Sequence, residues 1–128
     1  MKHLAIFVGD AIEKILNGKK TVECRFSLKK IVPFSQVHRN DEILLKQSGG
    51  QILGRVMVEK VISMENLDKE DFFRMQKGLF KEVCMTKKFW KSKENSKFAT
   101  FIFLKNPERF VAPINMPKKD RRAWVVIQ

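Results

Sequence analysis

The alternation of apolar and polar residues along this chain predicts several short strands and a smaller number of helices. Apolar runs bounded by turn residues predict seven strands, at residues 3–8, 20–26, 42–47, 51–62, 97–104, 109–112 and 122–127. Apolar residues at helical spacing predict one helix at 10–17 and two further helical pieces between 67 and 91. Gly49 and Gly50, which separate two of the apolar runs, are typical of a hairpin turn.

Local signals at the helix ends sharpen these expectations. Asp10 is expected to cap the first helix with its side chain, and Gly18 offers a stop beyond the last apolar position of that helix. In the later helical region, Asp68 is expected to cap the first piece. Gly78 is then expected to separate it from a second piece at 79–91, since glycine weakens a helix interior.

Length and composition predict one domain spanning residues 1–128. A chain of 128 residues is too short for two ordinary domains, and its 44% hydrophobic content, with eleven Phe, is enough for a core. No repeat, linker or low-complexity segment divides the sequence. The order of elements predicts an α+β fold in which a helical insert at about 65–92 interrupts a sheet.

The most informative charged residues lie where the first predicted helix gives way to a strand. Lys20 sits at that junction, and Glu23 and Arg25 follow at alternate positions of the strand. Alternate side chains of a strand face the same side, so Glu23 and Arg25 lie about 6.6 Å apart along one face. That distance suits an ion pair or the joint binding of one ligand. Cys24, between them, is expected to point to the opposite, inner side. A solvated face is the common alternative, which spacing alone leaves open.

These residues carry a resemblance to a known family. Gly18, Lys20, Glu23 and Arg25 match the G-x-K-x-x-E-x-R signature of the ASCH domain, a family within the PUA-like superfamily. Further similarity follows in order along the chain, at Asn40–Lys46, Gly54–Val61, Phe98–Leu104, Asn106–Phe110, Pro113–Ile114 and Trp124. The resemblance implies a PUA-like β-barrel with flanking helices, and a ligand-binding cleft lined by Lys20, Glu23 and Arg25.

The charge of the chain favours a polyanionic partner. The net charge of +12 and the pI near 10.0 are large for this length, although a lysine-rich surface also serves solubility. Seven lysines against two glutamates lie between Lys77 and Lys97, around Phe89 and Trp90. Helical spacing favours a core role for these two aromatic residues. The residues expected to contact nucleic acid are Lys87, Lys88, Lys91, Lys118, Lys119, Arg121 and Arg122.

Two classes of function fit the charged cluster and the resemblance. The first is an RNA-binding or modified-nucleotide-binding module, whose basic surface gathers phosphates while the cleft recognises a base or terminal group. The second is an enzyme, because the resemblance extends to small amidohydrolases that deacylate acetylated cytidine and to a metal-assisted ribonuclease. Lys20 matches the amidohydrolase lysine, but Glu23 occupies the position of its threonine, so no nucleophile carries over. Lys20 and Glu23 are the catalytic candidates if there is turnover, and binding is the favoured class.

Other kinds of site find little support in the sequence. Cys24 and Cys84 have no metal-binding spacing, and His3 and His38 are the only histidines, so we expect no metal and no cofactor. The loose candidates for the metal ligands of a ribonuclease are Asp41, Glu42 and Glu59. Because the sequence shows no secretory signal or membrane span, the expected location is the cytoplasm and the expected partner is RNA or a nucleotide, not a membrane. Protein partners are not indicated.

Overall fold

The computed structural model describes residues 1–117 and 121–127. Its elements are, in chain order, β1 (Lys2–Phe7), α1 (Ala11–Leu16), β2 (Val22–Ser27), β3 (Glu42–Gln47), β4 (Ile52–Glu65), α2 (Lys69–Val83), α3 (Lys87–Lys93), β5 (Phe98–Ile114) and β6 (Trp124–Val126). None of the helices within the described residues is long and apolar enough to cross a membrane.

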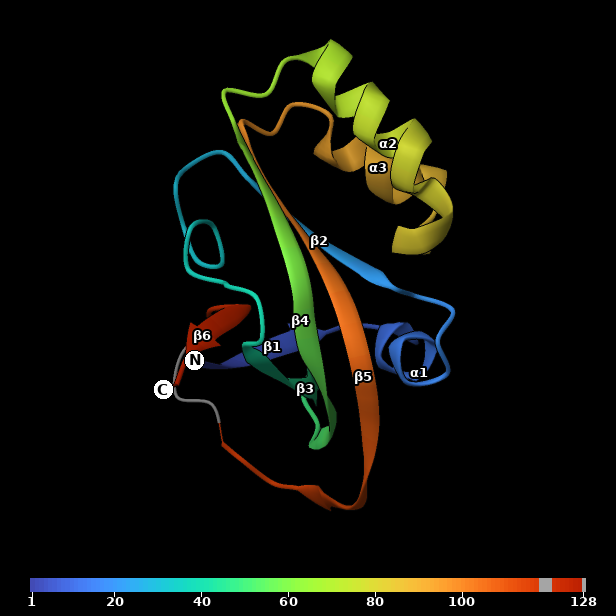
Figure 1. Cartoon of the computed structure of the whole chain (residues 1–128), viewed down its shortest axis with the longest axis vertical. Coiled ribbons are helices and arrows are strands. Elements are labelled where there is room, and N and C mark those ends of the chain that lie inside the picture. Colours follow the sequence, from blue (N-terminus) through green and yellow to red (C-terminus); the bar gives the residue numbers. More distant parts are fainter. Residues whose placement is uncertain (118–120, 128) are drawn as a thin grey trace.

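The described strands form one sheet in the order β2-β5-β4-β3-β1-β6. Neighbouring strands are antiparallel except β1 and β3, which are parallel. Figure 1 shows that β4 and β5 run the length of the molecule, with α2 and α3 packed together near one end and α1 beside the other half of β5. The predicted α+β class is therefore confirmed, and the sheet curls into a half-barrel.

Two buried clusters of apolar side chains hold the helices to the sheet. One contains Ile12 of α1 and Trp124 of β6. The other lies under α2 and α3 and contains Phe72, Trp90 and Cys24, the last of which points inward as predicted. Full burial of a large apolar side chain contributes about 1.5–3 kcal/mol, so these clusters fix the positions of the helices around β2.

The break in the helical insert lies beyond Gly78. Helix α2 runs through this glycine to Val83, so the predicted break at Gly78 and the predicted helix at 79–91 are wrong. An exposed glycine costs a helix only about 1 kcal/mol relative to alanine, and burial of Phe72 and Val83 outweighs that cost. The helix ends where Cys84 adopts the left-handed conformation, with φ of 59°.

The predicted helix ends are confirmed at Asp68 and Gly18 but not at Asp10. The Asp68 side chain accepts a hydrogen bond from the backbone N–H of Asp71 at 2.8 Å. Gly18 follows α1 with φ of 82°. Asp10 occupies the cap position of α1 without a side-chain cap hydrogen bond, because its carboxylate lies instead 3.4 Å from the ammonium group of Lys14.

The strands predicted at 97–104 and 109–112 form one continuous strand, β5, so the predicted interruption is wrong. Asn106, with φ of 53°, lies where the register of β5 against β4 shifts. A bulge of this kind bends a strand while pairing continues on both sides of it. The hairpin between β3 and β4 is confirmed, with Gly49 at φ of 70°.

Candidate functional site

The charged residues of the sequence motif converge in the structure. Lys20 precedes β2, and Glu23 and Arg25 alternate along it. The Lys20 ammonium group lies 3.2 Å from one oxygen of Glu23, and the Arg25 Nε donates to the other oxygen at 2.9 Å. Lys20 is only 2% exposed and Glu23 only 7%, so the alternative of a solvated strand face is wrong.

The carboxylate of Glu23 has both oxygens engaged by the protein. Besides Lys20 and Arg25, it accepts a hydrogen bond from the backbone N–H of Cys24 at 3.1 Å. Burial by itself would raise the pKa of Glu23, but the charges of Lys20 and Arg25 and their hydrogen bonds lower the pKa overall. Glu23 is therefore ionised at neutral pH, and it holds Arg25 in place.

Lys20 links this strand to the helical insert. Its Nζ donates to the backbone carbonyl of Val83, the last residue of α2, at 2.6 Å. This carbonyl is at the end of a helix, where backbone acceptors lack partners inside the helix. The ammonium group thus satisfies a helix end and a buried carboxylate together, which fixes α2 relative to β2.

Arg25 is held by hydrogen bonds and by two aromatic rings around its guanidinium group. Its Nη2 donates to the carbonyl of Ile6 in β1 at 3.0 Å, and Nη1 lies 3.4 Å from the carbonyl of Ala123. The group also lies between two aromatic rings, 5.0 Å from the centre of Phe7 and 5.1 Å from that of Trp124. These contacts join β2, at one edge of the sheet, to β1 and to the segment before β6 at the other edge.

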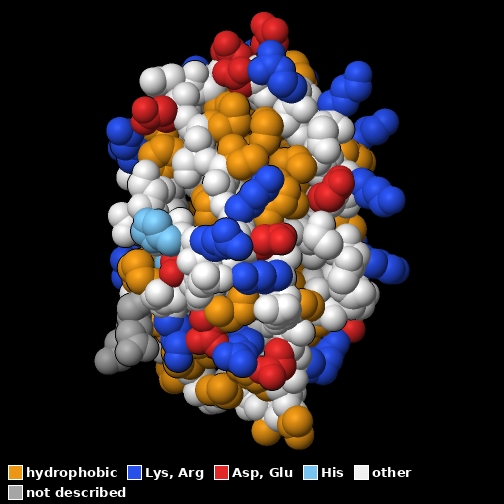
Figure 2. Space-filling view, in the orientation of Figure 1, with side chains coloured by type: hydrophobic (Ala, Val, Ile, Leu, Met, Phe, Trp, Pro, Cys, Tyr) orange, Lys and Arg blue, Asp and Glu red, His pale blue; other side chains and the backbone are white. Residues whose placement is uncertain are grey.

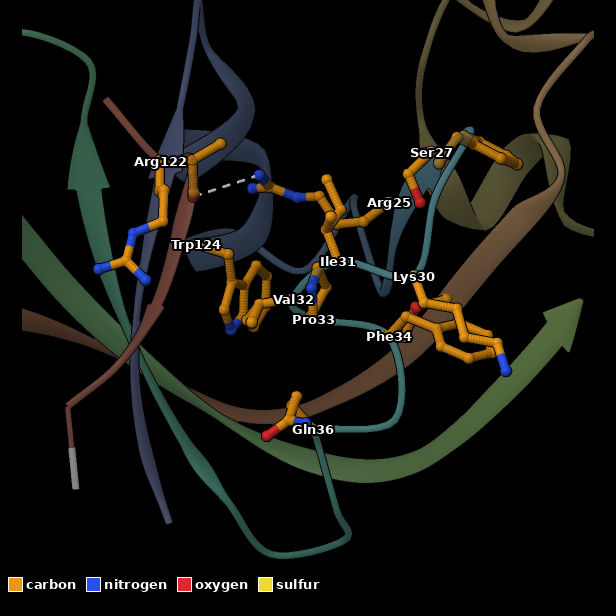
Figure 3. Close-up of a pocket in the computed structure, with 13 residues that line it drawn as sticks. Arg25, Ser27, Lys30, Ile31, Val32, Pro33, Phe34, Gln36, Arg122 and Trp124 are labelled. Atoms are coloured by element: carbon orange, nitrogen blue, oxygen red, sulfur yellow. Dashed lines mark hydrogen bonds between the residues drawn. The ribbon is translucent and has the colours of Figure 1, made fainter. Parts of the chain in front are cut away.

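Two cavities meet at Arg25. The motif cavity, of about 330 Å³, is lined by Lys20, Glu23, Arg25, Phe7, Phe89 and Lys93, among others. The loop cavity, of about 460 Å³, is lined by Arg25, Lys30, Phe34, Gln36, Arg122 and Trp124, among others. Figure 3 shows the loop cavity, with the Arg25 side chain extending toward the segment that carries Arg122 and Trp124.

Trp124 is held in the wall of the loop cavity by a buried hydrogen-bonded chain. Its indole Nε1 donates to His3 Nδ1 at 3.0 Å, and His3 Nε2 lies 2.9 Å from the carboxylate of Asp41. Because His3 Nδ1 accepts this bond, the imidazole carries its proton on Nε2 and donates it to Asp41. This chain fixes the orientation of the ring against which Arg25 packs.

The other basic residues named from the sequence occupy different places. Lys87 and Lys88 are exposed on α3, and Arg121 is exposed before β6, whereas Lys91 lies 3.1 Å from the carboxylate of Glu94. Arg122 lines the loop cavity. Figure 2 shows lysine and arginine side chains projecting along the edge of the molecule on the side of the helices. Two of the basic residues named from the sequence, Lys118 and Lys119, lie outside the described residues.

Several wall residues were not identified from the sequence. Lys30, Phe34 and Gln36 come from a segment without hydrophobic periodicity, so no pattern marks them. Lys93 follows Phe89 by one helical turn, and its ammonium group lies 5.7 Å from the centre of that ring. This spacing of a lysine and an aromatic residue was the available signal for the motif cavity.

Two of the three acidic residues named as loose metal candidates have protein partners. Asp41 contacts His3, and Glu42 contacts Arg55 at 2.7 Å. Glu59 is exposed on β4. Among residues 1–117 and 121–127, no group of three or more His, Cys, Asp or Glu side chains is placed to hold a metal ion.

Acid should destabilise the fold through Glu23 and Asp41. Burial would raise the pKa of Asp41, but its hydrogen bond with His3 contributes to an overall lowered pKa, as Lys20 and Arg25 do for Glu23. A lowered pKa stabilises the fold at pH values above the ordinary carboxyl pKa, about 4, and this stability is lost as pH falls through the lowered value.

Urea unfolding from pH 7 to pH 2 should show this loss of stability below about pH 4. In Asp41→Asn, which is less stable at pH 7, the loss should be smaller. An equal acid loss in the variant would contradict the role of Asp41.

Comparison with known proteins gives a family and a fold. The sequence model of the ASCH domain matches residues 9–111. The crystal structure of ASCH from Zymomonas mobilis is similar to this chain with 14% identity and a TM-score of 0.77, covering 99% of this chain and 87% of that one. The structure of hypothetical protein PH0355 has 18% identity and a TM-score of 0.52, covering 89% and 100%. No curated protein matches the chain. The predicted PUA-like fold is confirmed by these structures.

Proposed function

This chain belongs to the ASCH domain family, and on that premise we propose that it is an RNA-binding or modified-nucleotide-binding module. Family membership supports the general class, a PUA-type module of the RNA-binding kind. The finer part of the proposal is that the two cavities recognise the base while a basic surface binds the phosphates. It rests on the walls of the cavities and on the charge of the chain.

The observation that carries this proposal is the placement of Arg25. Its guanidinium group is fixed between Phe7 and Trp124 and forms part of the wall of both cavities. An arginine already ordered by protein contacts loses less conformational entropy when it binds phosphate or a base carbonyl. Arg25 is therefore suited to recognition, while Lys20 and Glu23 hold it in position.

The loop cavity combines basic side chains, of which Lys30 also pairs with Glu65 at 3.4 Å, with an apolar body. Arg25, Lys30 and Arg122 line it, and none of its described lining residues is acidic. Phe34 and Trp124 add aromatic surface. A nucleotide joins a flat aromatic base to a negatively charged phosphate, and proteins bind unstacked bases through aromatic contacts and basic side chains.

Binding is favoured over the amidohydrolase or ribonuclease alternative by the state of Lys20 and Glu23. Both line the motif cavity, as catalytic residues would. However, Lys20 Nζ is engaged by Val83 and Glu23, and both oxygens of Glu23 accept hydrogen bonds from the protein. A proton-transfer role would require these buried contacts to break, whereas a positioning role uses them as they are.

The proposal is tested by measuring the affinity of a fluorescein-labelled single-stranded RNA for Arg25→Lys. This variant keeps the charge but loses the planar fork, so we expect affinity to fall about tenfold or more. Arg109→Lys is the matched control, because Arg109 pairs with Glu13 on the surface away from both cavities, and its affinity should be unchanged. Thermal unfolding confirms that each variant is folded at the assay temperature. Equal affinity of Arg25→Lys and the wild type would refute the proposal, and product formation detected by chromatography would support the enzyme instead.

A further inference from the structure

The two cavities are adjacent, and their shared wall is made by three residues. Arg25, Phe26 and Ala123 line both the motif cavity and the loop cavity. The guanidinium group of Arg25 has an aromatic ring on each side, with Phe7 belonging to the motif cavity and Trp124 to the loop cavity. A ligand long enough to enter both cavities must therefore pass Arg25.

Both cavities have aromatic rings and a lysine in their walls, and the motif cavity is lined by Glu23 as well. The motif cavity has the rings of Phe7 and Phe89 and the ammonium group of Lys93. The loop cavity has aromatic walls as well, and its lysine is Lys30. Aromatic surface with a nearby cation is the arrangement that accepts a base and its phosphate in single-stranded nucleic acid, whatever the base.

Arg25 can donate a hydrogen bond to a ligand at the wall between the two cavities. Its Nε and Nη2 groups make short bonds with Glu23 and Ile6, of 2.9 and 3.0 Å. Nη1 carries two N–H groups, and its contact with the carbonyl of Ala123 is long, at 3.4 Å. A phosphate oxygen at Nη1 would form a shorter, charge-assisted bond than this one.

We propose that the cavities hold two successive nucleotides of one RNA strand, with one base in each cavity and the linking phosphate at Arg25 Nη1. This inference rests on the proposed function and narrows the ligand to two successive nucleotides of unpaired RNA. Volumes of about 330 and 460 Å³ fall within the range of small-ligand sites, so each suits one unit. Both bases must leave a helical stack to lie on opposite sides of Arg25, which excludes duplex RNA.

The test compares single nucleotides with dinucleotides by isothermal titration calorimetry. The probes are the four nucleoside 5′-monophosphates and the four homodinucleoside monophosphates ApA, CpC, GpG and UpU. At least one dinucleotide should bind about tenfold or more tightly than its mononucleotide, although the mononucleotide carries the greater charge, because linked units bind as one. Replacing the linking phosphate by a neutral methylphosphonate keeps the two units linked but removes the charge that faces Arg25 Nη1, so it should reduce that gain.

Two substitutions test whether each cavity holds one nucleotide of the dinucleotide. Val8 is 68% exposed and lines the motif cavity, and Gln36 is exposed and lines the loop cavity. Val8→Trp or Gln36→Trp should obstruct one cavity, so each should lower dinucleotide affinity to the mononucleotide level. Arg109→Trp, outside both cavities, should change neither affinity.

The failure of this inference is distinguishable from failure of the proposed function. If mononucleotides and dinucleotides bind equally, or if neither tryptophan variant lowers dinucleotide affinity, the two-nucleotide arrangement is overturned while nucleotide binding stands. If no probe binds at low salt and longer single-stranded RNA also fails to bind, both proposals are overturned.

Discussion

Replacing Glu23 by glutamine is expected to lower the free energy of unfolding by about 3 to 5 kcal/mol. The neutral amide leaves Lys20 and Arg25 without their shared counter-charge, and Lys20 is 2% exposed, so water cannot take its place. Urea unfolding at pH 7, followed by circular dichroism and fitted by linear extrapolation, measures this loss.

The control for this prediction is an exposed glutamate in a similar ion pair. Glu13 lies 2.7 Å from Arg109 and is 60% exposed, so Glu13→Gln should leave stability nearly unchanged. If Glu23→Gln were as stable as Glu13→Gln, the buried ion pairs of Glu23 would not be needed to hold β2 to the end of α2. If Glu23→Gln is destabilised but binds RNA normally while folded, Glu23 contributes to structure alone.

RNA affinity is expected to fall roughly 100-fold between 50 and 200 mM salt if about five phosphates are neutralised. For single strands the logarithm of the binding constant falls with the logarithm of salt by about 0.7 for each neutralised phosphate, which gives a slope of about −3.5 here. The net charge of +12 and the exposed lysines of α3 supply the cations. Fluorescence anisotropy over this salt range measures the slope.

Charge reversal locates the surface responsible for the salt dependence. Lys88→Glu on α3 should weaken binding to all RNA sequences alike and make the slope less steep, because phosphate contacts carry no sequence information. Lys105→Glu on β5 changes the net charge equally and should have a smaller effect. A flat salt dependence in the wild type would mean that the basic surface does not bind phosphate.

The convergence of the motif was predictable from sequence, but its burial was not. Alternate positions of a strand share a face whatever surrounds them, so spacing alone places Glu23 and Arg25 on the same face of the strand. Lys20 donates to Val83, sixty-three positions later, and Arg25 lies between Phe7 and Trp124, so the residues that bury this group come from distant segments. No local sequence pattern predicts which distant helix end will pack against a strand. The alternative of a solvated strand face therefore stayed open until the structure excluded it.

The loop cavity was missed for a related reason. Its outer wall is a segment without periodicity, which takes its position from distant contacts such as the packing of Phe34 on Phe98, with ring centres 5.2 Å apart. Trp124 is placed by His3, 121 positions away. The break at Cys84 was hidden because a non-glycine residue there adopts the left-handed conformation, while the more obvious Gly78 stays helical.

The most direct test of Arg25-centred recognition is nuclear magnetic resonance of the ¹⁵N-labelled protein titrated with single-stranded RNA. The chain has two tryptophans, with Trp124 in the wall of the loop cavity and Trp90 buried under α2 and α3. We predict large shifts of the Trp124 indole N–H and the Arg25 Nε–H, with a much smaller change at the Trp90 indole. If both predicted signals stay fixed while the amides of α3 shift, RNA binds the basic surface without entering the cavities, and the account is contradicted.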